Sequence, residues 1–271
     1  MSRTPAEAAG AVGDAFRDVF DQLTAWRTEI EALLRRGGGL PRPGGGGDAG
    51  PADLRTPELR PADLDHAIAE LVLPRLAAED PDLVGAGFIA DGEVVRGREV
   101  HFAWWLAPLD DNPVLGSTDV PTRLDLSTRG YTEYLRDFRA LEWYRIPATT
   151  RTAHVTGPYV DHLCTCDYIL TVTMPVQLAD GEPMVGVVGA DVAVRRLERD
   201  LLGVFLDVDE PLALVNEQGR VMLSTDPAVE VGRLVDGIAG RTDASGASAD
   251  RLVPCPDTPF AVLVRPADLL P

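Results

Sequence analysis

The first 36 residues carry hydrophobic side chains at intervals of three and four: Val12, Phe16, Val19, Phe20, Leu23, Trp26, Ile30, Leu33 and Leu34. This period matches one face of an α-helix, so residues 6–36 are predicted to form a long amphipathic helix that ends near Arg36. Its apolar stripe can pack on the protein's own core, or it can pair two chains as a homodimer. Residues 61–78 repeat the helical pattern over a shorter length.

Period-two alternation of apolar and polar residues follows, and it predicts strands at 83–90, 99–106, 168–176 and 184–192. Turn sequences join these strands in two pairs, which favours antiparallel hairpins. A helix is expected over 194–205, and a small sheet after residue 211. The fold class is therefore α+β: an antiparallel sheet flanked by helices, with a long N-terminal helix and a smaller C-terminal β subdomain.

The chain divides into four predicted parts. Residues 1–36 form the N-terminal helix. Residues 37–57 are rich in glycine and proline and read as a linker, because they contain too few apolar side chains to build a core. Residues 58–205 form the main domain, and residues 206–271 form the small β-rich module.

Composition and charge exclude several kinds of function. The 271 residues carry a formal charge of −18, which disfavours nucleic acid and anionic membrane surfaces as partners. The chain contains no lysine, so Schiff-base chemistry and a phosphate-loop lysine are excluded. The sequence has neither an apolar run of about 18 residues nor the order of a signal peptide, so a cytoplasmic location is expected.

Residues that suit a cationic ligand gather between Tyr134 and Asp191. Aromatic rings at Trp143, Tyr144 and Tyr159 offer faces for a cation, and the carboxylates of Asp161 and Asp191 offer charge-assisted hydrogen bonds. Each residue also has a simpler explanation. Trp143 can be part of the core, Asp161 can close its own turn over residues 156–161, and Asp191 can cap the helix that follows.

Metal and redox chemistry have little support in the sequence. Cys164 and Cys166 are two residues apart, but no second pair of cysteine or histidine ligands completes a tetrahedral site. The three cysteines are an odd number, which argues against a disulfide framework. No metal and no cofactor are expected.

Three short motifs in order resemble those of the Cache family of sensor domains, which have a PAS-like fold. They are DFRALEWY at residues 137–144, PYVD at 158–161 and GVVGAD at 186–191. The resemblance covers about residues 58–205, and the small sheet after 211 resembles the second module of double-Cache proteins. It implies a sensor that binds a small molecule and signals to a partner, and it does not imply an enzyme.

The resemblance also implies which residues touch the ligand: Tyr134, Arg139, Trp143, Tyr144, Tyr159, Asp161 and Asp191. In amino-acid-binding members an arginine two residues before the Trp-Tyr pair holds the ligand carboxylate, and here that position is Leu141. Asp191 matches the aspartate that takes the amino group. Arg139 either contacts the ligand or forms a surface ion pair.

We therefore expect an amine or amino-acid-like ligand. Two alternatives stay open: a structural protein that docks a partner through its N-terminal helix, and an enzyme that uses Asp161 and Asp191 as acid and base.

Overall fold

The computed structural model describes residues 2–37, 59–79, 81–110, 112, 116–124, 135–161, 165–179, 181–238 and 251–265. The linker prediction, apart from Gly37, and the candidates Tyr134 and Cys164 lie outside these residues. The helices are α1 (Pro5–Gly37), α2 (Pro61–Leu76), the 3-10 helix η1 (Leu135–Ala140), α4 (Glu142–Thr150) and α5 (Val194–Leu206). The strands are β1 (Gly85–Val95), β2 (Arg98–Leu106), β3 (Thr122–Arg123), β4 (His154–Val160), β5 (Tyr168–Val176), β6 (Gly186–Ala193), β7 (Leu212–Val215), β8 (Val221–Ser224), β9 (Arg251–Pro254) and β10 (Ala261–Val264).

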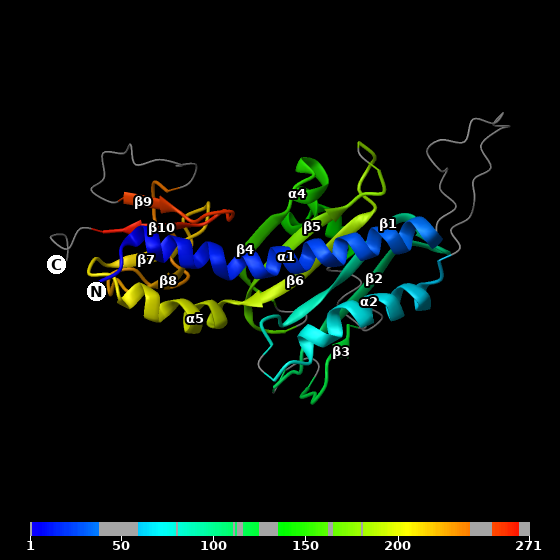
Figure 1. The fold of residues 1–271 in the computed structure, drawn as a ribbon, viewed down its shortest axis with the longest axis horizontal. Coiled ribbons are helices and arrows are strands. Elements are labelled where there is room, and N and C mark those ends of the chain that lie inside the picture. The colour runs from blue at the N-terminus through cyan, green and yellow to red at the C-terminus, as the bar shows by residue number, and fades with distance from the viewer. Residues whose placement is uncertain are drawn as a thin grey trace.

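A six-stranded antiparallel sheet is the centre of the fold, with strand order β3-β2-β1-β6-β5-β4. The two predicted hairpins, β1–β2 and β5–β6, lie side by side because β1 also pairs with β6 (Figure 1). The predicted α+β class with a central antiparallel sheet is confirmed. We call this the large sheet.

α1 lies along the large sheet and continues past it to the small sheet (Figure 1). Its apolar stripe, including Phe16, Leu23 and Ile30, is buried in the same hydrophobic cluster as strand residues such as Val172 and Val188. Of the two predictions for the apolar stripe, the structure shows packing on the protein's own core. A homodimer through residues 6–36 would therefore have to use another face of the helix. Dimerisation or docking of a partner through residues 6–36 stays a prediction from the sequence.

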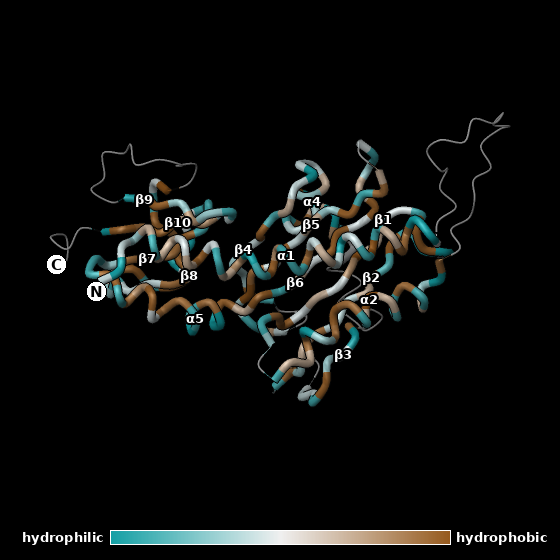
Figure 2. Tube along the Cα trace, in the orientation of Figure 1, coloured by the Kyte–Doolittle hydropathy of each residue, from teal (hydrophilic) through white to brown (hydrophobic). Residues whose placement is uncertain are grey.

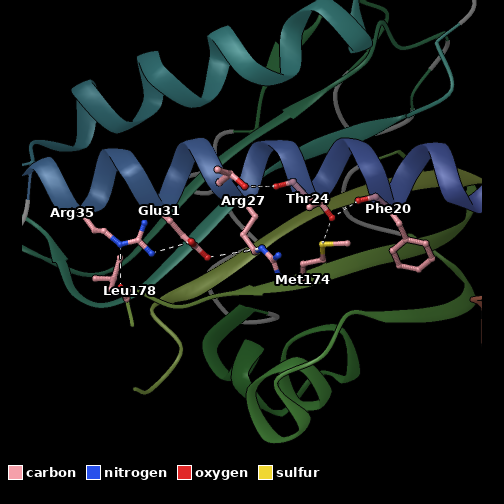
Figure 3. A network of polar contacts seen from close by, with 8 residues as sticks. Phe20, Thr24, Arg27, Glu31, Arg35, Met174 and Leu178 are labelled. Carbon is pink, nitrogen blue, oxygen red and sulfur yellow. Dashed lines mark hydrogen bonds and ion pairs between the residues drawn. The ribbon is translucent and has the colours of Figure 1, made fainter. Parts of the chain in front are cut away.

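Polar contacts fix the position of α1 on the β5 side of the large sheet (Figure 3). The Arg35 guanidinium donates from Nε to the Leu178 carbonyl at 3.1 Å and pairs with Glu31 at 3.0 Å. About three turns nearer the N-terminus, the Thr24 hydroxyl lies 3.7 Å from the sulfur of Met174. The helix is therefore held by directional contacts as well as by its buried stripe.

The small sheet has strand order β8-β7-β10-β9 and confirms the predicted C-terminal β subdomain. Its buried strands are hydrophobic, whereas hydrophobic and hydrophilic residues alternate along α5 (Figure 2). Leu197, Leu201 and Phe205 form the buried face of α5, which contacts both α1 and β8. α1 and α5 therefore cover the small sheet and contribute to its core.

The segment predicted as a turn at residues 156–161 is instead most of strand β4. The Gly-Pro pair suggested a turn, but the strand tolerates proline because β4 is the edge of the sheet and pairs only with β5. A register shift between Thr156 and Tyr159 accommodates Gly157, at φ 110°, and Pro158. β4 therefore brings Thr156 and Tyr159 alongside β5.

Candidate functional site

The face of the large sheet opposite α1 carries a row of buried polar side chains. Thr156 on β4 pairs with Thr171 on β5, and Thr171 pairs with Asp191 on β6. Residues that are directly opposite in antiparallel strands point to the same side of the sheet. Thr156, Thr171 and Asp191 are only 7%, 4% and 6% exposed. Burying polar side chains costs free energy, so a row of them on one face of a sheet indicates a candidate functional site.

A directed chain of hydrogen bonds ends at the Asp191 carboxyl group. The Thr171 hydroxyl donates to Asp191 Oδ1 at 2.7 Å. Because this bond uses the only proton of Thr171, the contact of 2.6 Å between the Tyr159 and Thr171 hydroxyls must be donated by Tyr159. Among the described residues, the second carboxyl oxygen, Oδ2, receives no hydrogen bond.

Burial raises the pKa of Asp191 from 3.8 to about 8. This value of about 8 also includes the nearby charge of Asp161, which raises the pKa, and the Thr171 hydrogen bond, which lowers it. Near neutral pH the isolated carboxyl group is therefore mostly protonated. A cation placed at Oδ2 would favour the ionised form, so this group is suited to a positively charged partner.

Glycines on β1 and β6 bring Trp104 of β2 close to this carboxyl group. Gly85 pairs with Asp191, and Gly87 pairs with Gly189. A Cβ atom at Gly85 would lie 2.9 Å from Asp191 Oδ2 and 3.0 Å from Trp104 Nε1. The missing side chain therefore leaves Oδ2 and the indole N–H bordering the same small space.

Asp161 follows the end of β4 and closes a turn. Its Oδ2 accepts hydrogen bonds from the backbone N–H of Thr165 at 2.8 Å and from the Thr165 hydroxyl at 3.0 Å. Asp161 therefore closes a turn that follows β4, and not the turn expected over residues 156–161. Through its charge Asp161 still acts on Asp191, so it contributes to the negative potential of the site.

The predicted residues of η1 and α4 lie at the other end of the same face. Arg139 donates to Asp91 at 2.9 Å from Nε, and Tyr144 also donates to Asp91. Burial acts to raise the pKa of Asp91, but these two hydrogen bonds outweigh it and lower that pKa. Asp91 lies six residues beyond Gly85 on β1, a separation of about 20 Å. Arg139 thus forms an ion pair away from Asp191.

Trp143 lies between the two groups. Its ring stacks on Phe138, with centroids 6.1 Å apart, and its carbonyl accepts a hydrogen bond from the Thr173 hydroxyl at 2.8 Å. Leu141, the N-cap of α4, packs into the same aromatic cluster. The hydrogen bond from Thr173 therefore attaches α4 to β5, two residues after Thr171 on the same strand.

The structure therefore brings together Tyr159, Asp161 and Asp191, and it separates Arg139 and Tyr144 from them. Sequence reasoning missed Thr156, Thr171 and Trp104. Thr171 had a usable signal, because threonine alternates with apolar residues in the buried strand β5. Thr156 was assigned to a turn, so its alternation with Val155 on a strand was not considered.

Cys166 and Cys255, the cysteines that the structure describes, are not joined by a disulfide. Burial raises the pKa of Cys255 to about 12, and burial together with the charge of Asp161 raises the pKa of Cys166. Within the described ranges no three histidine, cysteine, aspartate or glutamate side chains group to hold a metal ion. None of the described helices has the length and apolar character needed to cross a lipid bilayer.

Comparison with known proteins gives matches through structure alone. No family model matches the sequence, and no curated protein sequence is significantly similar to it. Among solved structures, the ligand-binding domain of the Pseudomonas fluorescens chemoreceptor CtaA in complex with L-valine superposes with a TM-score of 0.54 at 16% identity. The match covers 96% of this chain and 92% of that one.

Two further structures give the same picture. The periplasmic sensory domain of the Campylobacter jejuni chemoreceptor Tlp1 has a TM-score of 0.55 at 10% identity, covering 95% of this chain and 90% of that chain. The ligand-binding domain of the Pseudomonas aeruginosa chemoreceptor PctB with L-Gln has a TM-score of 0.52 at 13% identity, with 96% and 86% covered. The chain therefore has the fold of Cache-type sensor domains, as its motifs predicted.

Proposed function

We propose that this protein is a non-catalytic sensor module that binds a small ammonium-bearing metabolite at Asp191 and passes the signal to a partner. The observation that carries the proposal is the Asp191 carboxyl group. It is buried, its Oδ1 is held by Thr171, and its Oδ2 borders the space beside the Trp104 indole. A carboxylate accepts charge-assisted hydrogen bonds from an ammonium group, and the indole N–H beside it can donate to a polar atom of the same ligand.

The charge distribution around Asp191 supports an amine over an anion. Asp161 adds negative charge, and Leu141 provides no guanidinium group. Arg139 is engaged by Asp91 at the far end of the face. Two structural neighbours were crystallised with amino acids, L-valine and L-Gln, and both ligands carry an ammonium group. An amine or amino-acid-like ligand therefore remains our assignment.

The proposed site assigns Tyr159, Asp161 and Asp191 to the ligand end, with Trp143 beside it. The hydroxyls of Tyr159 and Thr171 donate toward the carboxyl group, so they set its orientation and do not act as nucleophiles. The acid–base alternative requires both Asp161 and Asp191, and it is disfavoured because Oδ2 of Asp161 is already engaged by the backbone and the hydroxyl of Thr165. The cytoplasmic location stays a prediction from the sequence.

Calorimetry with n-butylamine and butanoate, two ligands of similar size and opposite charge, tests the proposal. Wild-type protein should bind the amine in preference, and Asp191→Asn should weaken amine binding by about 10- to 100-fold, the scale of a hydrogen bond to a charged group. Asp200→Asn, an exposed change on α5, is the matched control and should leave affinity unchanged. Tighter binding of butanoate, or equal amine affinity in both variants, contradicts the proposal.

A further inference from the structure

One buried hydroxyl beside the candidate site has no hydrogen-bond partner. Thr156 Oγ1 is enclosed, and among the described residues it is the buried side-chain polar atom without a donor or acceptor. Buried polar groups in native proteins are almost always paired, and an exception calls for a reason such as a water or a ligand. The residue itself is 7% exposed, so bulk solvent does not supply the bond.

The neighbouring hydroxyls on this face already have partners. Tyr159 donates to Thr171, Thr171 donates to Asp191, and Thr173 donates to the Trp143 carbonyl. Within the described part of the chain, two atoms of the row are thus left without a hydrogen bond: the buried hydroxyl oxygen of Thr156, and Oδ2 of Asp191, whose other carboxyl oxygen is held by Thr171. They lie on the same face of the sheet, on either side of Thr171.

A purely structural role does not account for threonine at this position. Valine has the same branched shape and the same preference for strands, and it would fill the space without burying a hydroxyl. Thr156 lies directly before the register shift of β4 against β5. After this shift, the hydroxyl of Tyr159 also reaches Thr171 and forms a hydrogen bond with it. The edge strand thus supplies one hydroxyl that completes the chain to Asp191 and a second that faces the site without a bond.

We propose that Thr156 hydrogen-bonds a second polar group of the ligand, an oxygen separated from the ammonium nitrogen by a short carbon chain. Thr156 and Asp191 are two strands apart, or about 9.5 Å between their Cα atoms. Two hydrogen bonds of about 2.8 Å reduce this span, which leaves about 4–6 Å between the ligand's nitrogen and oxygen. A spacer of about three carbons fits, as in an amino alcohol or a short amino acid.

This inference rests on the proposed function and defines the ligand class more narrowly. The probes are 3-aminopropan-1-ol and n-butylamine, which have the same number of heavy atoms and differ by a hydroxyl in place of a methyl group. Wild-type protein should bind the amino alcohol about tenfold more tightly. Thr156→Val should remove this preference and leave n-butylamine affinity within about twofold, and Thr156→Ser should retain the preference.

Stability provides a separate readout. Because the hydroxyl has no partner among the residues that the structure describes, Thr156→Val without ligand should melt at the wild-type temperature or above it. A clearly lower melting temperature would assign the hydroxyl a structural bond and overturn the inference.

Binding results distinguish this inference from the proposed function. Equal affinity of the two probes for wild-type protein, or a preference that survives in Thr156→Val, overturns the role of Thr156 alone. Failure of the folded wild-type protein to bind either amine overturns the proposed function, and the role of Thr156 with it.

Discussion

The buried carboxyl group of Asp191 predicts that amine binding depends on pH. Its pKa is raised to about 8 by burial and by the charge of Asp161, so about 1% of it is ionised at pH 6 and about half at pH 8. A simple alkylamine stays protonated throughout this range. If the ammonium group binds the ionised carboxylate, the apparent affinity should rise about 50-fold from pH 6 to pH 8 and level off above it.

Calorimetry with 3-aminopropan-1-ol at several pH values, in buffers of different ionisation enthalpy, measures both the affinity and the released proton. Wild-type protein should release close to one proton per ligand at pH 6.5. Asp191→Asn should bind more weakly, with little pH dependence and no release. An affinity that is constant from pH 6 to pH 8, or a pH dependence that persists in Asp191→Asn, would refute the assignment of the cation to this carboxyl group.

The same raised pKa sets the sign of a stability effect. Between about pH 5 and pH 7 the folded protein without ligand holds a proton on Asp191 that the unfolded chain has lost. The free energy of unfolding should therefore decrease with rising pH through this group, by up to about 1.4 kcal/mol per pH unit. Asp191→Asn removes this contribution, so the difference between the two unfolding curves should change with pH by that amount.

Three further substitutions test other parts of the structure. Gly85→Ala places a Cβ 2.9 Å from Asp191 Oδ2, so amine affinity should fall at least tenfold in calorimetry. Arg139→Gln removes the ion pair to Asp91. It should lower the free energy of unfolding by about 1–2 kcal/mol in urea titration, with amine affinity unchanged within about twofold. Asn216→Ala removes the 2.7 Å hydrogen bond from the small sheet to a β4 carbonyl and should cost about 1 kcal/mol in the same assay.

Matched controls separate these effects from general destabilisation. Gly203→Ala on α5 adds a Cβ that meets nothing within 4 Å, so it should leave amine affinity unchanged. If Gly203→Ala and Gly85→Ala reduce affinity alike, the steric explanation at Gly85 is wrong. If Arg139→Gln abolishes amine binding, Arg139 belongs to the binding site after all.

The strands could be predicted because their signal is local. Alternation located Tyr168–Val176 with its observed bounds, and the two hairpins placed four strands of the large sheet. α4 was not predicted, because its nine residues include Pro147 and its N-cap Leu141 makes no side-chain capping bond. Short helices of this kind depend on packing against other elements more than on their own sequence.

The candidate site was predictable only in part, for the same reason. Asp191 was recognised because a carboxylate stands at the end of an apolar run. The partner of Arg139 could not be deduced, since Asp91 lies 48 residues earlier in the chain. The role of Trp104 depends on the pairing of β1 with β2 and β6, which sets the indole beside Gly85. Such contacts are fixed by strand register, which alternation alone does not specify.

β6 passes into α5 without an intervening loop: Asp191 is three residues before Val194, the first residue of the helix. The Asp191 carboxyl group is therefore connected directly to α5, a helix of 13 residues that is about 20 Å long. A tilt of about 3° at the strand end would therefore displace the far end of α5, at Leu206, by about 1 Å. α5 contacts β8 and α1, and Asp207 just beyond it accepts a hydrogen bond from the backbone N–H of Arg3. Spectroscopic probes at Leu206 should therefore respond to occupancy at Asp191, whereas probes at the opposite end of the large sheet should not.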